Sequence, residues 1–241
     1  MPALNHQAAV VTGASSGIGA AIALRLAEEG VKLHLIGRNS DGLEAVAQRA
    51  RTNSPRVCTY RANLDSDEDL EKLKTNLQLT CDGIDILVHS AGVIAIGPLE
   101  TTSLADFDRQ YRTNVRAPYA LTQALLPMLR VQHGCVVFIN SSTGLVTRAN
   151  ISQYSATKHA LKAMADSFRA EVNADGIRVL SIYPGRTASP QQAAIHKAEG
   201  KAYSPELLMQ PEDVARIVVE ALKVNRTAEV TDISIRPMRK T

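Results

Sequence analysis

The sequence lacks the long apolar runs of membrane proteins and the paired ligands of metal sites. None of its apolar stretches approaches the roughly 20 residues that a transmembrane helix needs, so we expect no membrane partner. Its three cysteines, Cys58, Cys81 and Cys135, are odd in number and widely spaced, and its six histidines show no ligand spacing. We therefore expect buried or incidental thiols, no disulfide framework and no metal.

The charged residues also do not form the patterns that indicate nucleic-acid binding or secretion. The formal net charge is +3 and the basic residues are scattered rather than clustered, so we expect no nucleic-acid partner. The first six residues, Met1 to His6, lack the charged-then-apolar pattern of a secretion signal. These features predict a cytoplasmic protein.

What the sequence does contain is a regular alternation of apolar strands and amphipathic helices. Hydrophobic residues make up 45% of the chain, which suits one large α/β domain over residues 1–241. The alternation predicts a Rossmann-type, doubly wound parallel sheet of about seven strands with helices on both faces. Strands are expected at 8–12, 32–37, 57–62, 86–89, 135–140, 178–183 and 229–235, and helices at about 17–29, 41–51, 66–78, 103–130, 154–174 and 211–223.

A glycine-rich turn follows the first predicted strand and precedes a helix. Gly13, Gly17 and Gly19 permit unusual dihedral angles and a close approach of the backbone to a ligand. The helix N-terminus that follows offers free N–H groups and a positive dipole end to a pyrophosphate. Tight turns also use glycine without a ligand, but the position in the first unit of an alternating α/β chain favours dinucleotide binding.

Tyr154 and Lys158 form the most informative pair in the chain. They are four residues apart in a predicted helix, so both side chains lie on one face. An ammonium ion stabilises a nearby phenolate, and each unit by which the phenol pKa falls below about 10 needs about 1.4 kcal/mol. Such a tyrosine can exchange a proton with an alcohol or carbonyl oxygen. The same spacing is common on solvated helices, so the rest of the chain decides between the two interpretations.

Other candidate residues follow the carboxyl ends of predicted strands, where ligands collect on a doubly wound sheet. Together with the two motifs above, they make the chain similar to the short-chain dehydrogenase/reductase family over essentially its whole length. The intervals also agree, with 27 residues from Asn114 to Ser141 and 13 from Ser141 to Tyr154. The resemblance rests on Thr12-Gly13-x-x-x-Gly17-x-Gly19, Ala91-Gly92, Asn114, Ser141, Tyr154-x-x-x-Lys158 and Pro184-Gly185.

The resemblance implies a catalytic role for four residues. Tyr154 would be the general acid/base, and Ser141 would hydrogen-bond the same substrate oxygen. Lys158 would bind the nicotinamide ribose and lower the tyrosine pKa, and Asn114 would help to hold the water chain that supplies protons. The enzyme would transfer a hydride between the nicotinamide and a small carbonyl or secondary-alcohol substrate.

The resemblance also implies a set of cofactor contacts, most of them at the strand ends. These are Gly13, Ser15, Ser16, Gly17, Ile18, Gly19, Arg38, Asn63, Leu64, Ala91, Gly92, Tyr154, Lys158, Pro184, Gly185 and Thr187.

Two assignments leave alternatives open. Pro118 has no N–H, so the carbonyl of Asn114, four residues earlier in a predicted helix, loses its usual partner. That carbonyl could accept a bond from a relay water, or the proline could be a simple structural kink. Ser142 competes with Ser141, since either could cap the strand end, but the interval to Tyr154 favours Ser141.

The residues after the second predicted strand favour NADP(H) over NAD(H). NAD-preferring members usually carry an acid there that binds the adenine ribose, whereas this chain has Arg38 and no acid before Asp41. Arg38 could pair with a 2′-phosphate, although a plain surface arginine is the alternative. Many NADP-specific relatives have a second basic residue where Ser16 stands, so the cationic pocket would be only half built.

Two positions depart from the common family pattern. The usual Asn-Asn-Ala-Gly is His89-Ser90-Ala91-Gly92 here, and we expect the histidine to be structural. The aspartate that often contacts adenine is Asn63, whose amide can donate and accept there.

The segment 187–211 is expected to form a mobile flap over the substrate, but its mixed composition names no substrate. An NAD-dependent alcohol or sugar-alcohol dehydrogenase is the close alternative function. A non-enzymatic dinucleotide-binding regulator is the other, although it would be expected to lose Tyr154 or Lys158. Because the family often assembles through the helices near 103–130 and 154–174, we expect a homodimer or homotetramer.

Overall fold

A parallel sheet of seven strands forms the centre of the computed structural model, which describes residues 4–239. The strands are β1 (Ala8–Thr12), β2 (Lys32–Gly37), β3 (Val57–Arg61), β4 (Ile86–His89), β5 (Cys135–Ile139), β6 (Arg178–Pro184) and β7 (Asp232–Ile235). They lie in the order β3-β2-β1-β4-β5-β6-β7, and all neighbours are parallel. Met1 to Ala3, from the segment examined for a secretion signal, lie outside the described residues, as do Lys240 and Thr241.

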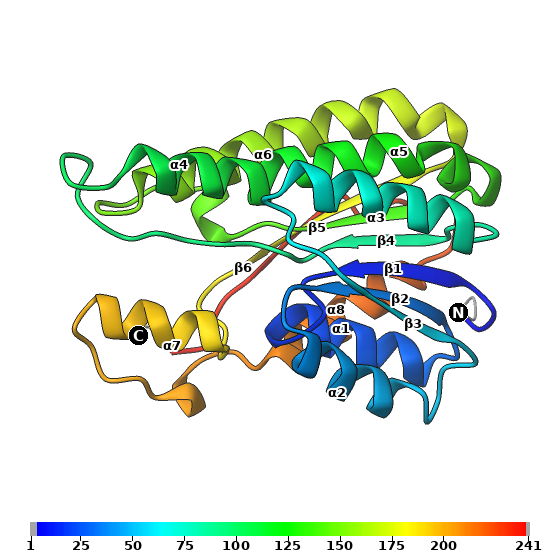
Figure 1. Cartoon of the computed structure of the whole chain (residues 1–241), viewed down its shortest axis with the longest axis horizontal. Helices are drawn as coiled ribbons and strands as arrows, with labels where there is room; N and C mark the ends of the chain where they lie inside the picture. Colours follow the sequence, from blue (N-terminus) through cyan, green and yellow to red (C-terminus); the bar gives the residue numbers. More distant parts are fainter. Residues whose placement is uncertain (1–3, 240–241) are drawn as a thin grey trace.

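Two layers of helices cover the sheet, one on each face (Figure 1). The helices are α1 (Gly17–Glu28), α2 (Ser40–Ala50), α3 (Asp67–Thr80), α4 (Leu104–Tyr111), α5 (Ala117–Gln132), α6 (Ser152–Val172), α7 (Pro190–Ala198) and α8 (Pro211–Leu222). In this view α1, α2 and α8 lie below the sheet, and α3 to α6 lie above it. The short helix α7 stands apart from both layers, at the lower left.

Each face of the sheet packs into its own hydrophobic core. Val10 and Val11, adjacent on β1, enter opposite cores because successive side chains of a strand point to opposite faces. Ile22 of α1 and Val218 of α8 complete one core, and Leu121 of α5 lies in the other. Burying such a side chain contributes roughly 1.5–3 kcal/mol. Strands covered on both faces explain why several of them are apolar without alternation.

The predicted doubly wound parallel sheet is confirmed, with differences in three of the elements. The last strand begins at Asp232 rather than at residue 229. Helix α7, inside the segment expected to be a flap, was not predicted. It begins at Pro190 and is capped by Ser189, whose hydroxyl accepts the N–H of Gln192.

The predicted helix over 103–130 is helical from Leu104 to Gln132, but it is not α-helical throughout. A π-helical turn, Arg112–Arg116, separates α4 from α5, and the Ala117 N–H bonds to the carbonyl of Arg112, five residues back. Pro118 lies at this junction and has no N–H for the α-helical bond to the Asn114 carbonyl. The helix therefore changes its hydrogen-bond pattern around Asn114.

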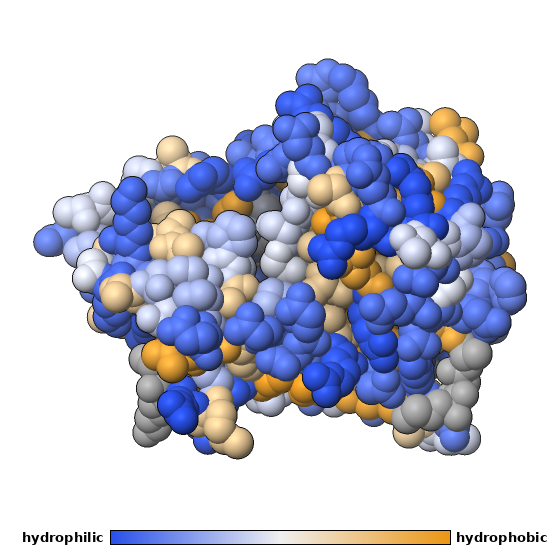
Figure 2. All heavy atoms as spheres, turned by 90° about the horizontal axis from the view of Figure 1, so that it is seen from below, coloured by the Kyte–Doolittle hydropathy of each residue, from blue (hydrophilic) through white to orange (hydrophobic). Residues whose placement is uncertain are grey.

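The face seen from below carries mainly hydrophilic residues, with apolar ones in small scattered groups (Figure 2). Among residues 4–239 no helix is both long and apolar enough to span a bilayer.

Candidate active site

A cleft of about 1290 Å³ opens at the carboxyl ends of the strands. All of the predicted cofactor contacts line it, and so do Ser141, Tyr154 and Lys158 from the predicted catalytic set. The fourth, Asn114, does not line the cleft but bonds to Val93, which does. The structure thus brings together residues from six separate strand ends, as expected for a doubly wound sheet.

The glycine turn after β1 depends on close backbone contacts. Gly13 has a φ of +69°, and a Cβ there would lie 2.8 Å from the backbone N of Ala91. A Cβ on Gly19 would lie 2.4 Å from the carbonyl oxygen of Gly13. Both distances are too short for any side chain. The turn after β1, the start of α1 and the loop after β4 therefore pack backbone against backbone.

Thr12 joins the turn to the loop after β4. Its Oγ1 accepts the N–H groups of Ser90 and Ala91, each at 3.1 Å, and lies 3.3 Å from the Val88 carbonyl, to which it donates. The sequence prediction included Thr12 in the family motif without a role. Its part is to hold the Ala91-Gly92 segment against the turn.

The N-terminus of α1 differs from those of the next three helices. Asn39, Ser66 and Ser103 cap α2, α3 and α4 by accepting a backbone N–H. Ser16 stands at the N-cap position of α1, but its side chain accepts no backbone N–H, and the first turn of α1 contains no acidic residue. Its N–H groups, on residues that line the cleft, thus keep their capacity to bind an anion. These features fit the diphosphate of a dinucleotide.

Tyr154 and Lys158 lie on one face of α6, as their spacing predicts. Lys158 is almost fully buried, and its Nζ donates to the Ile139 carbonyl at 3.1 Å. The same Nζ lies 5.7 Å from the centroid of the Tyr154 ring. Because burial disfavours the charged form, the pKa of Lys158 is lowered to about 8.

The pKa of Tyr154 differs from the sequence expectation. Burial raises it to about 12, and a hydrogen bond with Ser141 acts in the opposite direction with less effect. The expectation was that Lys158 would lower this pKa below its ordinary value. Lys158 instead directs a hydrogen bond to a main-chain carbonyl, and the removal of water from the phenol dominates.

Asn114 acts through its side chain as a clamp. Its Oδ1 accepts the Val93 N–H at 2.9 Å, and its Nδ2 donates to the Val93 carbonyl at 2.9 Å and to Thr157 Oγ1 at 3.0 Å. The amide therefore ties the loop after β4 to α6. Both N–H groups of the side chain are thus used, and Pro118 leaves the backbone carbonyl of Asn114 without its α-helical partner.

The far end of the cleft lies next to β2 and β3. Arg38 is exposed there and makes no ion pair with an acidic group of residues 4–239. Asn63 and Leu64 line the same end, and the Asn63 N–H bonds to an Asp69 carboxylate oxygen at 2.8 Å. This end has one guanidinium and no carboxylate in its lining.

The expected structural role of His89 is confirmed. The ring is buried, lies 2.9 Å from Thr122 Oγ1 and stacks on Phe138 at 5.0 Å between ring centroids. Burial lowers its pKa to about 3, so the ring is neutral at physiological pH. It contributes no group to the cleft lining.

The cysteines lie apart from the cleft. Cys81 and Cys135 are buried and Cys58 is half-buried. Burial raises the pKa of the Cys81 and Cys135 thiols to about 11. Within residues 4–239 no group of three or more potential ligands could hold a metal ion.

The first part of the segment 187–211 lines the cleft, and the two ends of the segment are joined to each other. Thr187 and Met209 form a β-bridge, and the Ala188 N–H bonds to the Met209 carbonyl at 2.8 Å. Arg148 and Arg186 also line this end of the cleft, and the sequence prediction missed both. No motif marks them, because their partner, Glu199, lies on the flap and meets them only in the fold.

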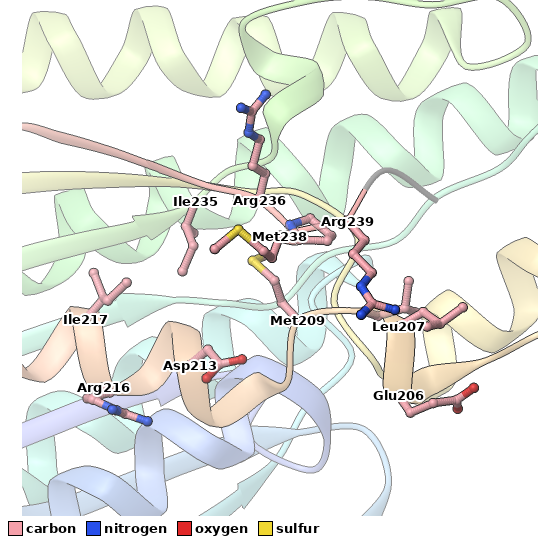
Figure 3. A pocket seen from close by; sticks show the side chains of 12 residues that line it. Glu206, Leu207, Met209, Asp213, Arg216, Ile217, Ile235, Arg236, Met238 and Arg239 are labelled. Carbon is pink, nitrogen blue, oxygen red and sulfur yellow. The ribbon is translucent and has the colours of Figure 1, made fainter.

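A second hollow, of about 660 Å³, lies between α8, the end of the flap and the C-terminal segment (Figure 3). Met209, Ile217 and Met238 contribute apolar side chains to its lining, and Arg216 and Arg239 contribute charged ones. It shares no lining residue with the main cleft.

Known proteins match the chain in family, sequence and structure. Residues 7–200 match the family described as short chain dehydrogenase. An uncharacterized oxidoreductase of Staphylococcus aureus (strain N315) is 33% identical over 239 residues, covering 99% of this chain and 100% of that protein. An alcohol dehydrogenase of Thermococcus sibiricus, solved with 5-hydroxy-NADP, is 26% identical with a TM-score of 0.87 and 98% coverage of both chains. The L-sorbose reductase of Gluconobacter frateurii, solved with NADPH and L-sorbose, is 25% identical with a TM-score of 0.88, covering 99% of this chain and 98% of that one.

The chain therefore belongs to the short-chain dehydrogenase/reductase family. Its fold is the one that the sequence predicted, and it is an NAD(P)-dependent oxidoreductase.

Proposed function

We propose that the protein interconverts a carbonyl compound and a secondary alcohol with NADP(H), and that Tyr154 is the general acid/base. The observation that supports this most strongly is that Ser141, Tyr154 and Lys158 share one cleft with the glycine turn. A site with both parts can hold a dinucleotide and exchange a proton with an oxygen beside it.

The residues divide the chemistry as follows. The Tyr154 hydroxyl gives its proton to the carbonyl oxygen in reduction, and a raised pKa keeps it protonated at neutral pH. The Ser141 hydroxyl holds the same oxygen near the phenol. Lys158 binds the nicotinamide ribose, and the Asn114 carbonyl holds a water that returns the proton. NADPH supplies the hydride when bound.

The preference for NADP(H) is supported by Arg38. It is the charged side chain at the adenine end of the cleft, whose lining includes no carboxylate to bind the ribose hydroxyls. A guanidinium makes charge-assisted bonds to a phosphate. The two solved relatives named above were obtained with NADPH and with an NADP derivative, in keeping with this preference.

The first experiment measures thermal stabilisation by NADPH and by NADH at matched concentrations, because a ligand that binds only the folded state raises the melting temperature. Wild type is compared with Arg38→Ser and with a control, Arg49→Ser, which removes an exposed arginine of α2 outside the cleft. We expect a larger shift with NADPH in wild type and in the control, and a loss of about 1.5–3 kcal/mol of that preference in Arg38→Ser.

A larger shift with NADH would overturn the assignment of Arg38 and favour the NAD-dependent alcohol or sugar-alcohol dehydrogenase. Binding without turnover of any carbonyl or alcohol would favour the dinucleotide-binding regulator. Either result leaves the family assignment intact.

We also propose a cytoplasmic homodimer or homotetramer that assembles through α4, α5 and α6. Exposed apolar side chains on two of these helices support it: Leu104 is 80% exposed, Tyr119 56% and Val131 75%. Light scattering of the purified protein gives its mass directly, and a monomer would refute the proposal.

A further inference from the structure

The cleft carries charge of one sign among its described lining residues. No aspartate or glutamate lines it, whereas Arg38, Arg109, Arg148, Lys158 and Arg186 do. The proposed function uses Arg38 and Lys158 for the cofactor. The other three have no role in it, and Arg109 is paired with Asp106 at 2.9 Å. Arg148 and Arg186, which meet at the flap end of the cleft, therefore need a separate explanation.

Arg186 is held in place by a carboxylate and an imidazole. Its Nη2 donates to both carboxylate oxygens of Glu199, at 3.0 and 2.7 Å, and its Nη1 lies 3.2 Å from His196 Nε2. His196 Nδ1 lies 2.9 Å from the Gln192 carbonyl oxygen, which can only accept a hydrogen bond. The Nδ1 atom therefore carries the hydrogen, and Nε2 is left as the acceptor for the arginine. The side chain of Arg186 is only 17% exposed, so these contacts fix it.

Part of the guanidinium stays available to a ligand. The Arg186 Nε–H has no hydrogen-bond partner within residues 4–239. Arg186 lines the cleft and Glu199 does not. The carboxylate thus orients the arginine from outside the cleft and leaves the lining itself cationic.

Positive charge also outnumbers negative charge at this point. Besides Arg186, the Glu199 carboxylate lies 3.2 Å from Arg148 Nη2 and 3.2 Å from Lys201 Nζ. Burial acts to raise the Glu199 pKa, but hydrogen bonds from Arg186 and Lys201 lower it to about 2. One negative charge therefore meets three positive ones, and the excess favours a further anion.

We propose that the substrate carries a carboxylate, which Arg186 binds together with Arg148 at the flap end of the cleft. This rests on the function proposed above and adds the chemical class of the substrate, an oxo acid or, in oxidation, a hydroxy acid. Charge-assisted bonds between a guanidinium and a carboxylate are among the strongest hydrogen bonds in proteins. Glu199 and His196 are positioning residues, because they contact Arg186 rather than the substrate.

The cofactor diphosphate is the other anion that these arginines could bind. The uncapped N-terminus of α1 already offers it N–H groups beside the glycine turn. Arg148, by contrast, comes from the segment between Ser141 and Tyr154, which hold the reacting oxygen in the proposed function. If the arginines bind the substrate carboxylate, replacing them should leave NADPH affinity unchanged. If they bind the cofactor diphosphate, replacing them should weaken it.

The test measures NADPH oxidation with matched pairs of substrates, each an oxo acid and its methyl ester. Pyruvate, acetoacetate and levulinate vary the distance between ketone and carboxylate. The variants are Arg186→Gln and Arg148→Gln, the second at a side chain that is 47% exposed and so tolerant of change. Lys197→Gln is the matched control, since it removes an exposed charge of α7 that does not line the cleft.

We expect wild type to favour an acid over its ester. Arg186→Gln should lower kcat/KM for the acid about 10- to 100-fold more than for the ester, because only the acid loses a charge-assisted bond. Arg148→Gln should give a smaller loss, and the control none. Equal kcat/KM for acid and ester, or weakened NADPH binding in both arginine variants, would overturn the proposal.

Failure of the proposed function has a different signature. Wild type would then reduce neither member of any pair although NADPH binds. The anion site is tested independently of turnover by adding glutarate or dimethyl glutarate to the NADPH complex. Glutarate should raise the melting temperature more, and Arg186→Gln should remove that difference. Equal shifts would refute the carboxylate site whether or not reduction occurs.

Discussion

The glycine turn and the flap both line the cleft and are held in different ways. At the turn, a Cβ on Gly19 would lie 2.4 Å from a backbone oxygen, whereas one on Gly200 in the flap would meet nothing within 4 Å. Between its ends the flap is held to the rest of the protein largely by side chains, above all by the ion pairs of Glu199. In the function proposed here, main-chain N–H groups beside the glycine turn bind the cofactor diphosphate, and arginine side chains at the flap end of the cleft bind the substrate.

The largest effect is expected at Tyr154, which lies on α6 and belongs to neither region. Tyr154→Phe removes one oxygen and leaves both the turn and the flap intact. If Tyr154 is the general acid, kcat for carbonyl reduction should fall about 10²- to 10⁴-fold. NADPH affinity, measured by fluorescence titration, should change little. A variant with more than a tenth of wild-type kcat would contradict the assignment.

The same substitution placed in each region tests the comparison directly. Gly19→Ala forces a methyl group against the Gly13 carbonyl, and overpacking of this kind costs about 1–3 kcal/mol. We expect NADPH affinity to fall about 10-fold or more, since 1.4 kcal/mol is a factor of ten.

Gly200→Ala is the matched control, at a φ of +66° with open space around it. It should cost roughly 1–2 kcal/mol of folding stability through backbone strain and leave NADPH affinity unchanged. Equal losses of affinity in the two variants would remove the distinction between the regions.

A smaller, pH-dependent effect is expected from Lys158. Its pKa is lowered to about 8, so the ammonium loses its proton as the pH rises through that value. A charge-assisted bond to the ribose then becomes a neutral one, and the Kd for NADPH should rise several-fold between about pH 7 and 9. Arg38→Ser should show the same pH dependence, because it acts at the other end of the cofactor. A flat profile would argue against a Lys158–ribose bond.

The smallest effect is expected in the flap. The folded-state pKa of Glu199 is lowered from 4.5 to about 2, so its ion pairs stabilise the fold above pH 4.5 and this contribution is lost as the pH falls toward 2. Pepsin, which works in this range, should cleave the flap faster as the pH drops. In Glu199→Gln the cleavage should already be a few-fold faster at pH 4.5 and should gain less on acidification. Identical profiles would mean that Glu199 does not hold the flap.

The comparison also explains how much the sequence could predict. The strands, most helices and the glycine turn follow from local rules, because periodicity and backbone geometry restrict which residues can occupy them. Of the predicted catalytic residues, Ser141, Tyr154 and Lys158 line the cleft as expected. Their roles remain predictions that the experiments above test.

The remaining features depend on contacts between residues distant in the sequence. Arg148 and Glu199 are 51 positions apart, and nothing local to either indicates the pair. The π-helical turn that contains Asn114 could be located only from the hydrogen bonds of the structure, although Pro118 gave a partial signal. The raised pKa of Tyr154 follows from burial, which spacing alone does not provide.

The β-bridge between Thr187 and Met209 has a consequence for how this enzyme can diverge. Because the bridge closes the flap at its base, extra residues inserted between these two positions cost mainly the entropy of a longer loop. Doubling the length of such a loop costs only about 0.6 kcal/mol. Insertions and deletions in the flap are therefore thermodynamically inexpensive, and if the flap end binds the substrate as proposed, new specificity can arise there while the sheet and the glycine turn stay as they are.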